Sequence, residues 1–182
     1  MSTIVATNIQ SDTIKHSGGT TAQTIDSTGR ILTPARPFFR VGMTTSQTGI
    51  TGFTEVVFDT VKTNIGGHYS TSTGRFTVPI SGIYQFGHSV LFQDVATSDD
   101  GIELQYRVNG ADDDKKYQFD RADGTDANGY SGSGGYLNSR GAGAMQLTAG
   151  QYVSVFLQAS GAIGVHGNSN SSWSQWYGYL IG

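Results

Sequence analysis

The stretch from His68 to Phe86, HYSTSTGRFTVPISGIYQF, places strand-forming residues around closely spaced breakers. We predict a turn at Thr73-Gly74-Arg75, because glycine tolerates the backbone angles of a tight turn. Phe76 and Val78 then share one face of a short strand, since side chains alternate along a strand. Pro79 to Gly82 ends the pairing of this strand, because proline cannot donate to a ladder. Such short strands between breakers are typical of an all-β domain.

The composition of the 182 residues also indicates a β-rich protein with many turns. Only 14% are charged, 26 are glycine and 36% are hydrophobic, whereas a helical protein carries more Glu, Lys, Leu and Ala. The length suits one core with an appendage. The formal net charge of −3 lacks the basic excess that binding of nucleic acid requires. Cysteine is absent, which excludes disulfides and thiolate metal sites.

The sequence carries no sign of membrane insertion or secretion. No segment approaches the ~20 apolar residues of a membrane span. The first ten residues, MSTIVATNIQ, have neither the basic opening nor the apolar run of a secretion signal. We therefore expect a soluble protein that is synthesised in a cytosol.

Alternating apolar residues predict several further strands after Phe38, because a period of two places them on one face. A last, aromatic strand is expected from Trp173 to Ile181, and Asn109-Gly110 is a favoured turn pair. Short strands joined by Gly, Asn and Asp turns, without a sustained helical period, predict a jelly-roll β-sandwich. The alternating sets are Tyr84, Phe86, His88, Val90 and Phe92; Ile102, Leu104, Tyr106 and Val108; and Val153, Val155 and Leu157.

Residues 1–36 differ from the rest, since they are rich in Ser and Thr and contain no aromatic residue. Thr-Ile recurs at spacings of 10 and 11, which indicates a weak β-repeat. We predict an extended N-terminal docking arm, residues 1–36, that gains order on a partner chain, followed by a domain over residues 37–182. The alternative is a disordered leader. The contact residues expected in the arm are Ile4, Ile14, Ile25 and Arg30.

The most specific pattern lies between residues 55 and 92. It comprises Phe58, Val61, Asn64, His68-Tyr69, Thr73 to Thr77, Pro79, Gly82, Tyr84 and Phe86. In these residues the chain resembles the globular-head domain of the C1q-like family, part of the tumour-necrosis-factor-like jelly-roll group. A weaker likeness at residues 145–153 and 173–182 extends the resemblance over residues 38–182, although residues 110–140 depart from it. The chain has no collagen-like Gly-X-Y stalk.

The resemblance implies a jelly-roll homotrimer. Trimerisation would bury aromatic strand faces and give three arms a common point of attachment. The residues expected to pack in the core or in the trimer interface are Tyr84, Phe86, His88, Phe92, Trp176, Tyr177 and Tyr179.

The arm segment TIKHSGGTTAQTIDSTGRILTPARP, residues 13–37, resembles the leaders of small bacteriophage virion proteins that carry such a jelly roll. This resemblance implies assembly on a phage particle, with phage capsid or tail proteins as partners of the arm.

Residues that could carry chemistry do not form a recognisable site. The histidines show neither HxxxH nor HExxH spacing, and Ser131-Gly132-Ser133-Gly134-Gly135 fails the Gly-x-Ser-x-Gly pattern. We expect His88 to be a core or trimer-interface residue. Acidic residues at 99–100, 112–114, 120, 123 and 126 leave open a calcium site, although a solvated acidic loop is favoured because none matches a calcium-loop motif. We expect no cofactor and no catalytic or metal-binding residue.

Together these observations predict a non-enzymatic phage virion structural protein at the virion surface. A trimeric knob anchored by its arms would decorate or cement the capsid, since 36 residues reach at most roughly 120 Å. The alternative within this class is a tail or head fibre tip, a receptor-binding adhesin that contacts a host-surface glycan. A free ligand-binding or adhesion module is the second class, and its activity would survive loss of the arm.

Overall fold

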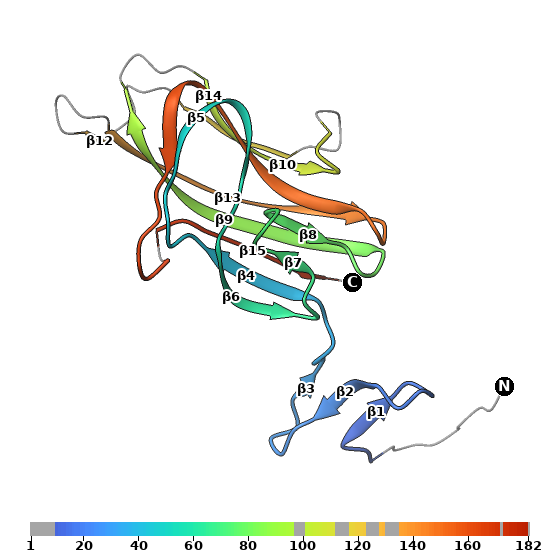
Figure 1. Cartoon of the computed structure of the whole chain (residues 1–182). Helices are drawn as coiled ribbons and strands as arrows, with labels where there is room; N and C mark the ends of the chain where they lie inside the picture. The colour runs from blue at the N-terminus through green and yellow to red at the C-terminus, as the bar shows by residue number, and fades with distance from the viewer. Residues whose placement is uncertain are drawn as a thin grey trace. The chain divides into compact units, whose positions relative to one another are not determined.

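The computed structural model describes residues 10–96, 101–111, 117–122, 128–129, 135–171 and 173–181 (Figure 1). The chain divides into two compact units, Met1–Arg36 and Pro37–Gly182. Within the described residues there is no helix of the length and apolarity needed to cross a membrane.

Three short strands form an antiparallel sheet in the first unit, in the order β1-β2-β3. They are β1 (Thr13–Lys15), β2 (Thr21–Ile25) and β3 (Ile31–Leu32). The hairpin between β2 and β3 is closed by Asp26, whose Oδ1 accepts hydrogen bonds from the backbone N of Thr28 at 2.9 Å and of Arg30 at 3.0 Å. The expected extended arm is therefore, over its described residues, a small β-meander.

The second unit is a sandwich of antiparallel strands in two layers. Its strands are β4 (Phe38–Gly42), β5 (Gln47–Val56), β6 (Thr60–Ile65), β7 (Tyr69–Ser70), β8 (Arg75–Thr77), β9 (Gly82–Val95), β10 (Ile102–Val108), β11 (Tyr117–Ala122), β12 (Asn128–Gly129), β13 (Gly135–Leu147), β14 (Tyr152–Val165) and β15 (Gln175–Leu180).

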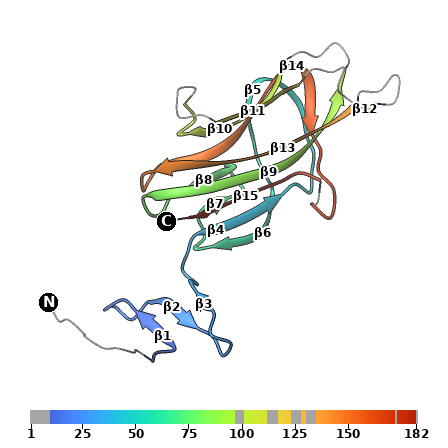
Figure 2. The same ribbon diagram turned by 180° about the vertical axis from the view of Figure 1, so that it is seen from behind.

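One layer runs β6-β4-β15-β9-β13-β12, and the other places β10 and β11 on one side of β14 with β5 and β8-β7 on its other side (Figures 1 and 2). The layers join where the end of β14 pairs with β9, at Gly164↔Gln93 and Val165↔Phe92. This all-β sandwich confirms the predicted jelly-roll class.

Aromatic side chains fill the space between the layers, because the inward positions of alternating strands carry them. Trp176 is fully buried at the centre of this core. Its ring meets Phe39 edge-on at 4.6 Å between centroids and lies 5.9 Å from Phe86. Edge and offset contacts of this kind add about 0.5–1.5 kcal/mol each beyond the burial of apolar area.

The stretch from His68 to Phe86 forms the predicted strands and turn. Gly74 ends the turn between β7 and β8 with φ at 71°, and a side chain there would press on the backbone oxygen of Val56. Tyr69 is held by Asn64, whose side chain donates to its carbonyl at 3.0 Å and accepts from its backbone N at 3.1 Å. The sequence pattern thus specifies the β7-β8 turn and the contact between β6 and β7.

Of two further local predictions, one differs from the structure and one, the Asn109-Gly110 turn, is confirmed. The last strand begins at Gln175, so Trp173 lies in the preceding loop and not on the expected strand. Asn109 and Gly110 form a turn with φ values of 53° and 73°. In this turn the backbone N of Ala111 donates to the carbonyl of Val108 at 3.1 Å.

Candidate functional site

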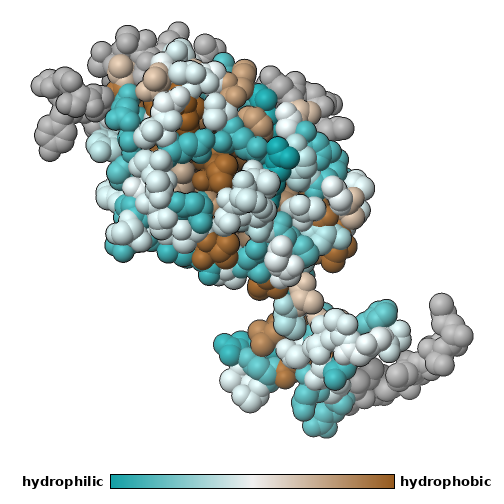
Figure 3. Space-filling view, in the orientation of Figure 1, coloured by the Kyte–Doolittle hydropathy of each residue, from teal (hydrophilic) through white to brown (hydrophobic). Residues whose placement is uncertain are grey.

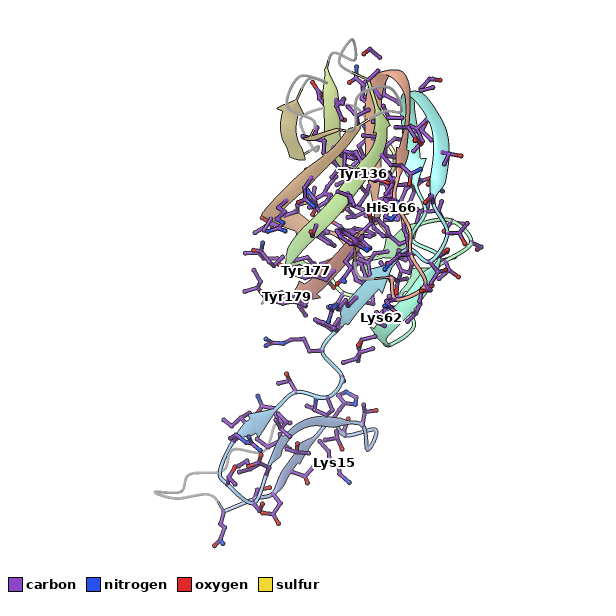
Figure 4. All side chains as sticks on the ribbon, turned by 90° about the vertical axis from the view of Figure 1, so that its left-hand side faces the viewer. Lys15, Lys62, Tyr136, His166, Tyr177 and Tyr179 are labelled. Carbon is purple, nitrogen blue, oxygen red and sulfur yellow. The ribbon has the colours of Figure 1, made fainter. Side chains whose placement is uncertain are left out.

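The outer side of the layer β4-β15-β9-β13 carries a row of aromatic residues. Tyr179 pairs with Phe38 on β4 and with Gln85 on β9. Tyr177 pairs in the same way with Arg40 and Gly87. Because residues two apart on a strand share a face, both tyrosines point away from the core that holds Trp176. Figure 4 shows the two tyrosines next to each other.

We call this surface the aromatic face and define it by Phe38, Ile83, Tyr177, Tyr179 and Ile181. Tyr177 and Tyr179 are each 37% exposed, and the two isoleucines are more exposed than either. The rings of Phe38 and Tyr179 stack with their centroids 6.4 Å apart. Ile181 donates its backbone N to the carbonyl of Ile83 at 2.7 Å, which brings the two isoleucines together. An apolar surface of this kind on one layer is characteristic of a protein contact.

Small residues lie beside the aromatic row and make it uneven. Tyr177 lies over Gly87, and the next residue in the same row, on β13, is Ala142. Arg40 is fixed at the edge of the face because its Nε and Nη2 donate to Oε1 of Gln175 at 3.0 Å and 2.7 Å. The Tyr177 ring therefore projects beside the low surface formed by Gly87 and Ala142. Another copy of the chain can complement a surface of this uneven shape.

The structure separates the predicted packing residues into two groups. Tyr177 and Tyr179 are exposed on the aromatic face, and the remaining five are buried between the layers. The sequence could not separate them, because alternation tells which residues share a face and not which face is covered. The buried residues are Tyr84, Phe86, His88, Phe92 and Trp176.

His88 is a buried, hydrogen-bonded histidine of the core. Its Nδ1 lies 2.6 Å from the hydroxyl oxygen of Tyr106, and its Nε2 lies 3.0 Å from Oγ of Ser139. Burial raises the pKa of Tyr106 above its ordinary value, so this hydroxyl stays protonated. The arrangement joins β9, β10 and β13.

Two of the predicted contact residues of the arm, Ile14 and Ile25, lie on strands of the β1-β2-β3 sheet. Ile14 is opposite Gln23, and Ile25 is opposite Ile31, so the three isoleucines share one face of the meander. All three are exposed, and Figure 3 shows hydrophobic atoms at the surface of this unit. Ile31 was missed by the sequence analysis, although its register with Ile25 follows from the Asp26 hairpin.

Arg30 and Ile4 differ from the isoleucines. The Arg30 side chain is 74% exposed, and its Nε donates to Oδ2 of Asp26 at 2.7 Å. Hydrogen bonds from the Thr28 side chain, and then from Arg30, lower the pKa of Asp26 to about 2. Arg30 therefore closes its own hairpin. Ile4 lies outside the described residues.

The described acidic and histidine side chains bear on the calcium hypothesis. No cluster of three His, Asp or Glu side chains that could hold an ion exists in the part of the chain that the structure describes. The acidic residues at positions 99–100, 112–114, 123 and 126 lie outside it, and at position 120 only the backbone is described.

Comparisons with known proteins agree with this architecture. The family model of the C1q domain matches residues 38–181. The globular domain of the zebrafish complement 1qA protein superimposes with a TM-score of 0.54 at 16% identity, covering 80% of this chain and 98% of that one. Murine APRIL, in a crystal structure at pH 8.0, gives a TM-score of 0.53 at 15% identity, covering 80% and 99%. At these identities the two structures establish a shared fold.

Proposed function

The chain belongs to the C1q domain family, and on this premise we propose that it is a non-enzymatic structural protein of a bacteriophage particle. Three copies form a jelly-roll knob, and their N-terminal units attach it to the particle. The knob decorates or cements the capsid and is exposed at the virion surface, after synthesis in the host cytoplasm. The phage assignment is supported by the likeness of residues 13–37 to virion leaders.

The aromatic face supports the homotrimer. Phe38, Tyr177 and Tyr179 expose ring surface on a sheet whose other side already packs on the core. Burying such rings against copies of the same chain removes apolar area from water at roughly 25 cal/mol per Å². A closed ring of three copies leaves no such face unpaired.

The observation that carries the docking role is the isoleucine face of the N-terminal unit. Ile14, Ile25 and Ile31 share one side of a three-stranded sheet and remain exposed there. Over residues 10–36, which the structure describes in this unit, the sheet is a single layer, so its apolar side chains gain burial by docking on another surface. A capsid protein is the partner that we propose, because an arm of this length suits a local attachment.

The test compares two sets of substitutions in the full chain. The triple variant Ile14→Ser/Ile25→Ser/Ile31→Ser should lose binding to empty capsids in a co-sedimentation assay. The control variant Leu32→Ser changes an exposed residue on the opposite side of the meander and should bind as the unmodified chain does. Equal binding by the triple variant and the unmodified chain would overturn the docking role.

A fibre-tip adhesin is the second candidate, and one observation favours it. Trp173, 52% exposed, lies in the loop that precedes β15. Immunogold labelling of intact particles separates the two candidates. An even label over the head supports decoration, whereas a label confined to the tail supports the fibre tip and excludes decoration.

A further inference from the structure

Three aromatic side chains from different segments meet at one rim of the sandwich. Tyr136 belongs to β13, His166 follows the end of β14, and Trp173 precedes β15. The imidazole centroid lies 5.7 Å from the Tyr136 ring and 6.2 Å from the Trp173 ring, and it is nearly perpendicular to each, at 89° and 83°. We call these three residues the rim cluster, and Figure 4 shows two of its members, Tyr136 and His166, close together.

The rim cluster is open to solvent. Tyr136 is 45% exposed and Trp173 is 52% exposed, whereas Trp176, three residues further along, is fully buried. Exposed tryptophan and tyrosine are typical of recognition surfaces, because their rings offer apolar contact area and a polar atom at low cost in conformational entropy. The sandwich core needs neither ring, so their placement at the surface calls for another role.

A chain of hydrogen bonds holds His166 in one orientation. Oε1 of Gln93 lies 2.7 Å from Nδ1 of His166 and accepts from Oγ of Ser46 at 2.9 Å. The amide nitrogen of Gln93 donates to Oδ2 of Asp94 at 2.9 Å, which fixes the orientation of the amide. Nδ1 must then carry the proton, and Nε2 of the neutral ring is an acceptor.

The backbone next to the rim cluster is unusual. Between the pairs Phe92↔Leu137 and Val95↔Gly135, strand β9 has two residues where β13 has only Tyr136. This bulge contains Asp94, whose φ of 62° is rare for a residue other than glycine. Bulges re-aim side chains, and strained residues persist mainly where they have a use. Here the bulge places an exposed carboxylate across the ladder from Tyr136.

Hydrogen bonds from neighbouring loops and strands also hold the backbone around His166 in place. Oγ of Ser174 donates to the carbonyl of His166 at 2.7 Å and accepts from the backbone N of Leu91 at 3.2 Å. Gly167 donates to Oγ of Ser46 at 3.0 Å and packs so closely on the backbone of Thr45 that a side chain there would collide with it. A surface held this firmly loses little entropy when it binds a ligand.

We propose that the rim cluster, together with Asp94, is a binding site for a sugar ring of a neutral glycan. The ring faces of Trp173 and Tyr136 suit the apolar C–H face of a pyranose, and Nε2 of His166 and the Asp94 carboxylate accept hydrogen bonds from its hydroxyl groups. A quaternary ammonium group is the main competitor, but it is best held when aromatic rings enclose and desolvate it, and this cluster is open. The site goes beyond the proposed structural role and belongs to the knob wherever the knob is mounted.

Fluorescence provides a direct test, because the chain has two tryptophans and only Trp173 is exposed. Quenching by acrylamide in the full chain should therefore report mainly on Trp173. We expect methyl glycosides of glucose, galactose, mannose or N-acetylglucosamine to protect it, with at least one active below about 100 mM, since single rings bind open sites weakly. Choline serves as the competing probe.

Variants complete the test. Tyr136→Ala should weaken binding of the active glycoside about tenfold, as expected for loss of one stacking ring. Trp173→Phe should retain glycoside binding by NMR titration while its quenching no longer responds to sugar. Ile80→Ala, an exposed residue of another loop, is the control and should bind normally. Protection by choline alone, no protection by any glycoside, or unchanged binding by Tyr136→Ala would each overturn the proposal.

Discussion

The ring of Tyr177 lies directly over Gly87, its cross-strand partner on the outer side of β15 and β9. A Cβ atom at Gly87 would collide with the phenol ring, so the absence of a side chain on one strand determines how an exposed ring lies on the next. The shape of the aromatic face depends on this pair, and the first prediction follows from it.

The substitution Gly87→Ala should weaken self-association. The added methyl group forces the Tyr177 ring away from the sheet and disturbs the surface that copies of the chain would share. Sedimentation velocity should show a shift from trimer toward monomer, while circular dichroism stays that of a folded β protein. In a Tyr177→Ser background the same substitution should have no further effect, because the ring on which it acts is gone. An unchanged trimer in Gly87→Ala would contradict this.

The core should be far more sensitive than the surface to loss of an aromatic ring. Phe76 is fully buried and stacks on Phe39 with centroids 4.7 Å apart. Its replacement in Phe76→Ala should lower the free energy of unfolding by about 3–5 kcal/mol. Phe53→Ala removes an exposed ring that lies 4.3 Å from the Arg107 guanidinium and should cost much less. Urea unfolding of both variants measures the difference, and similar losses would contradict the assignment of the core.

The hydroxyl of Tyr69 should contribute to stability through a paired hydrogen bond. It donates to the carbonyl of Phe58 at 2.9 Å and accepts from the Phe58 backbone N at 3.2 Å. In Tyr69→Phe both backbone groups lose their partner in a buried place, which should cost about 1–3 kcal/mol. The measurement is again urea unfolding, with Tyr136→Phe, an exposed tyrosine, as the matched control that should change little.

Asp59 should make the fold sensitive to acid. Its partial burial raises the pKa, but hydrogen bonds from the backbone and side chain of Thr44 and from Thr45 and Thr60 outweigh burial and leave the pKa lowered from 3.8. A lowered carboxyl pKa gives stability that is present above the unfolded value and is lost as the pH falls through the folded one.

The variant Asp59→Asn tests this relation. It should be less stable at pH 7, because an amide has one accepting oxygen where the carboxylate uses two, with Oδ1 2.7 Å from the Thr44 N and Oδ2 2.9 Å from the Thr45 N. Between pH 5 and pH 2 the unmodified chain should lose more stability than Asp59→Asn. Parallel acid dependence of the two urea midpoints would show that Asp59 is not responsible.

Strand positions could be predicted from the sequence where alternation is long and uninterrupted. The run from Tyr84 to Phe92 shows one apolar face and lies within β9. The predicted start of the last strand, at Trp173, was wrong, because β15 begins at Gln175. Aromatic residues favour a strand in a sequence-based prediction, but a single aromatic residue can equally lie in the loop before it. The seven predicted packing residues likewise mixed the core with the aromatic face, since alternation contains no information on which side is covered.

Pairings between distant segments could not be predicted, because they depend on where the whole chain brings its strands. Phe38 meets Tyr179, and His166 meets both Tyr136 and Trp173, only through the strand order of the sandwich. The single signal available in the sequence was an aromatic residue in a polar loop, which does not identify its neighbours.

The amino-acid sequence by itself determined the fold class, the turn at Gly74 and the membership of residues in alternating faces, because these depend on local backbone preferences and on the period of a strand. Only the tertiary structure decided which faces are buried and which side chains gather at the aromatic face and the rim cluster. Those properties arise from antiparallel pairing between strands far apart in the chain, where register across the sheet brings residues together.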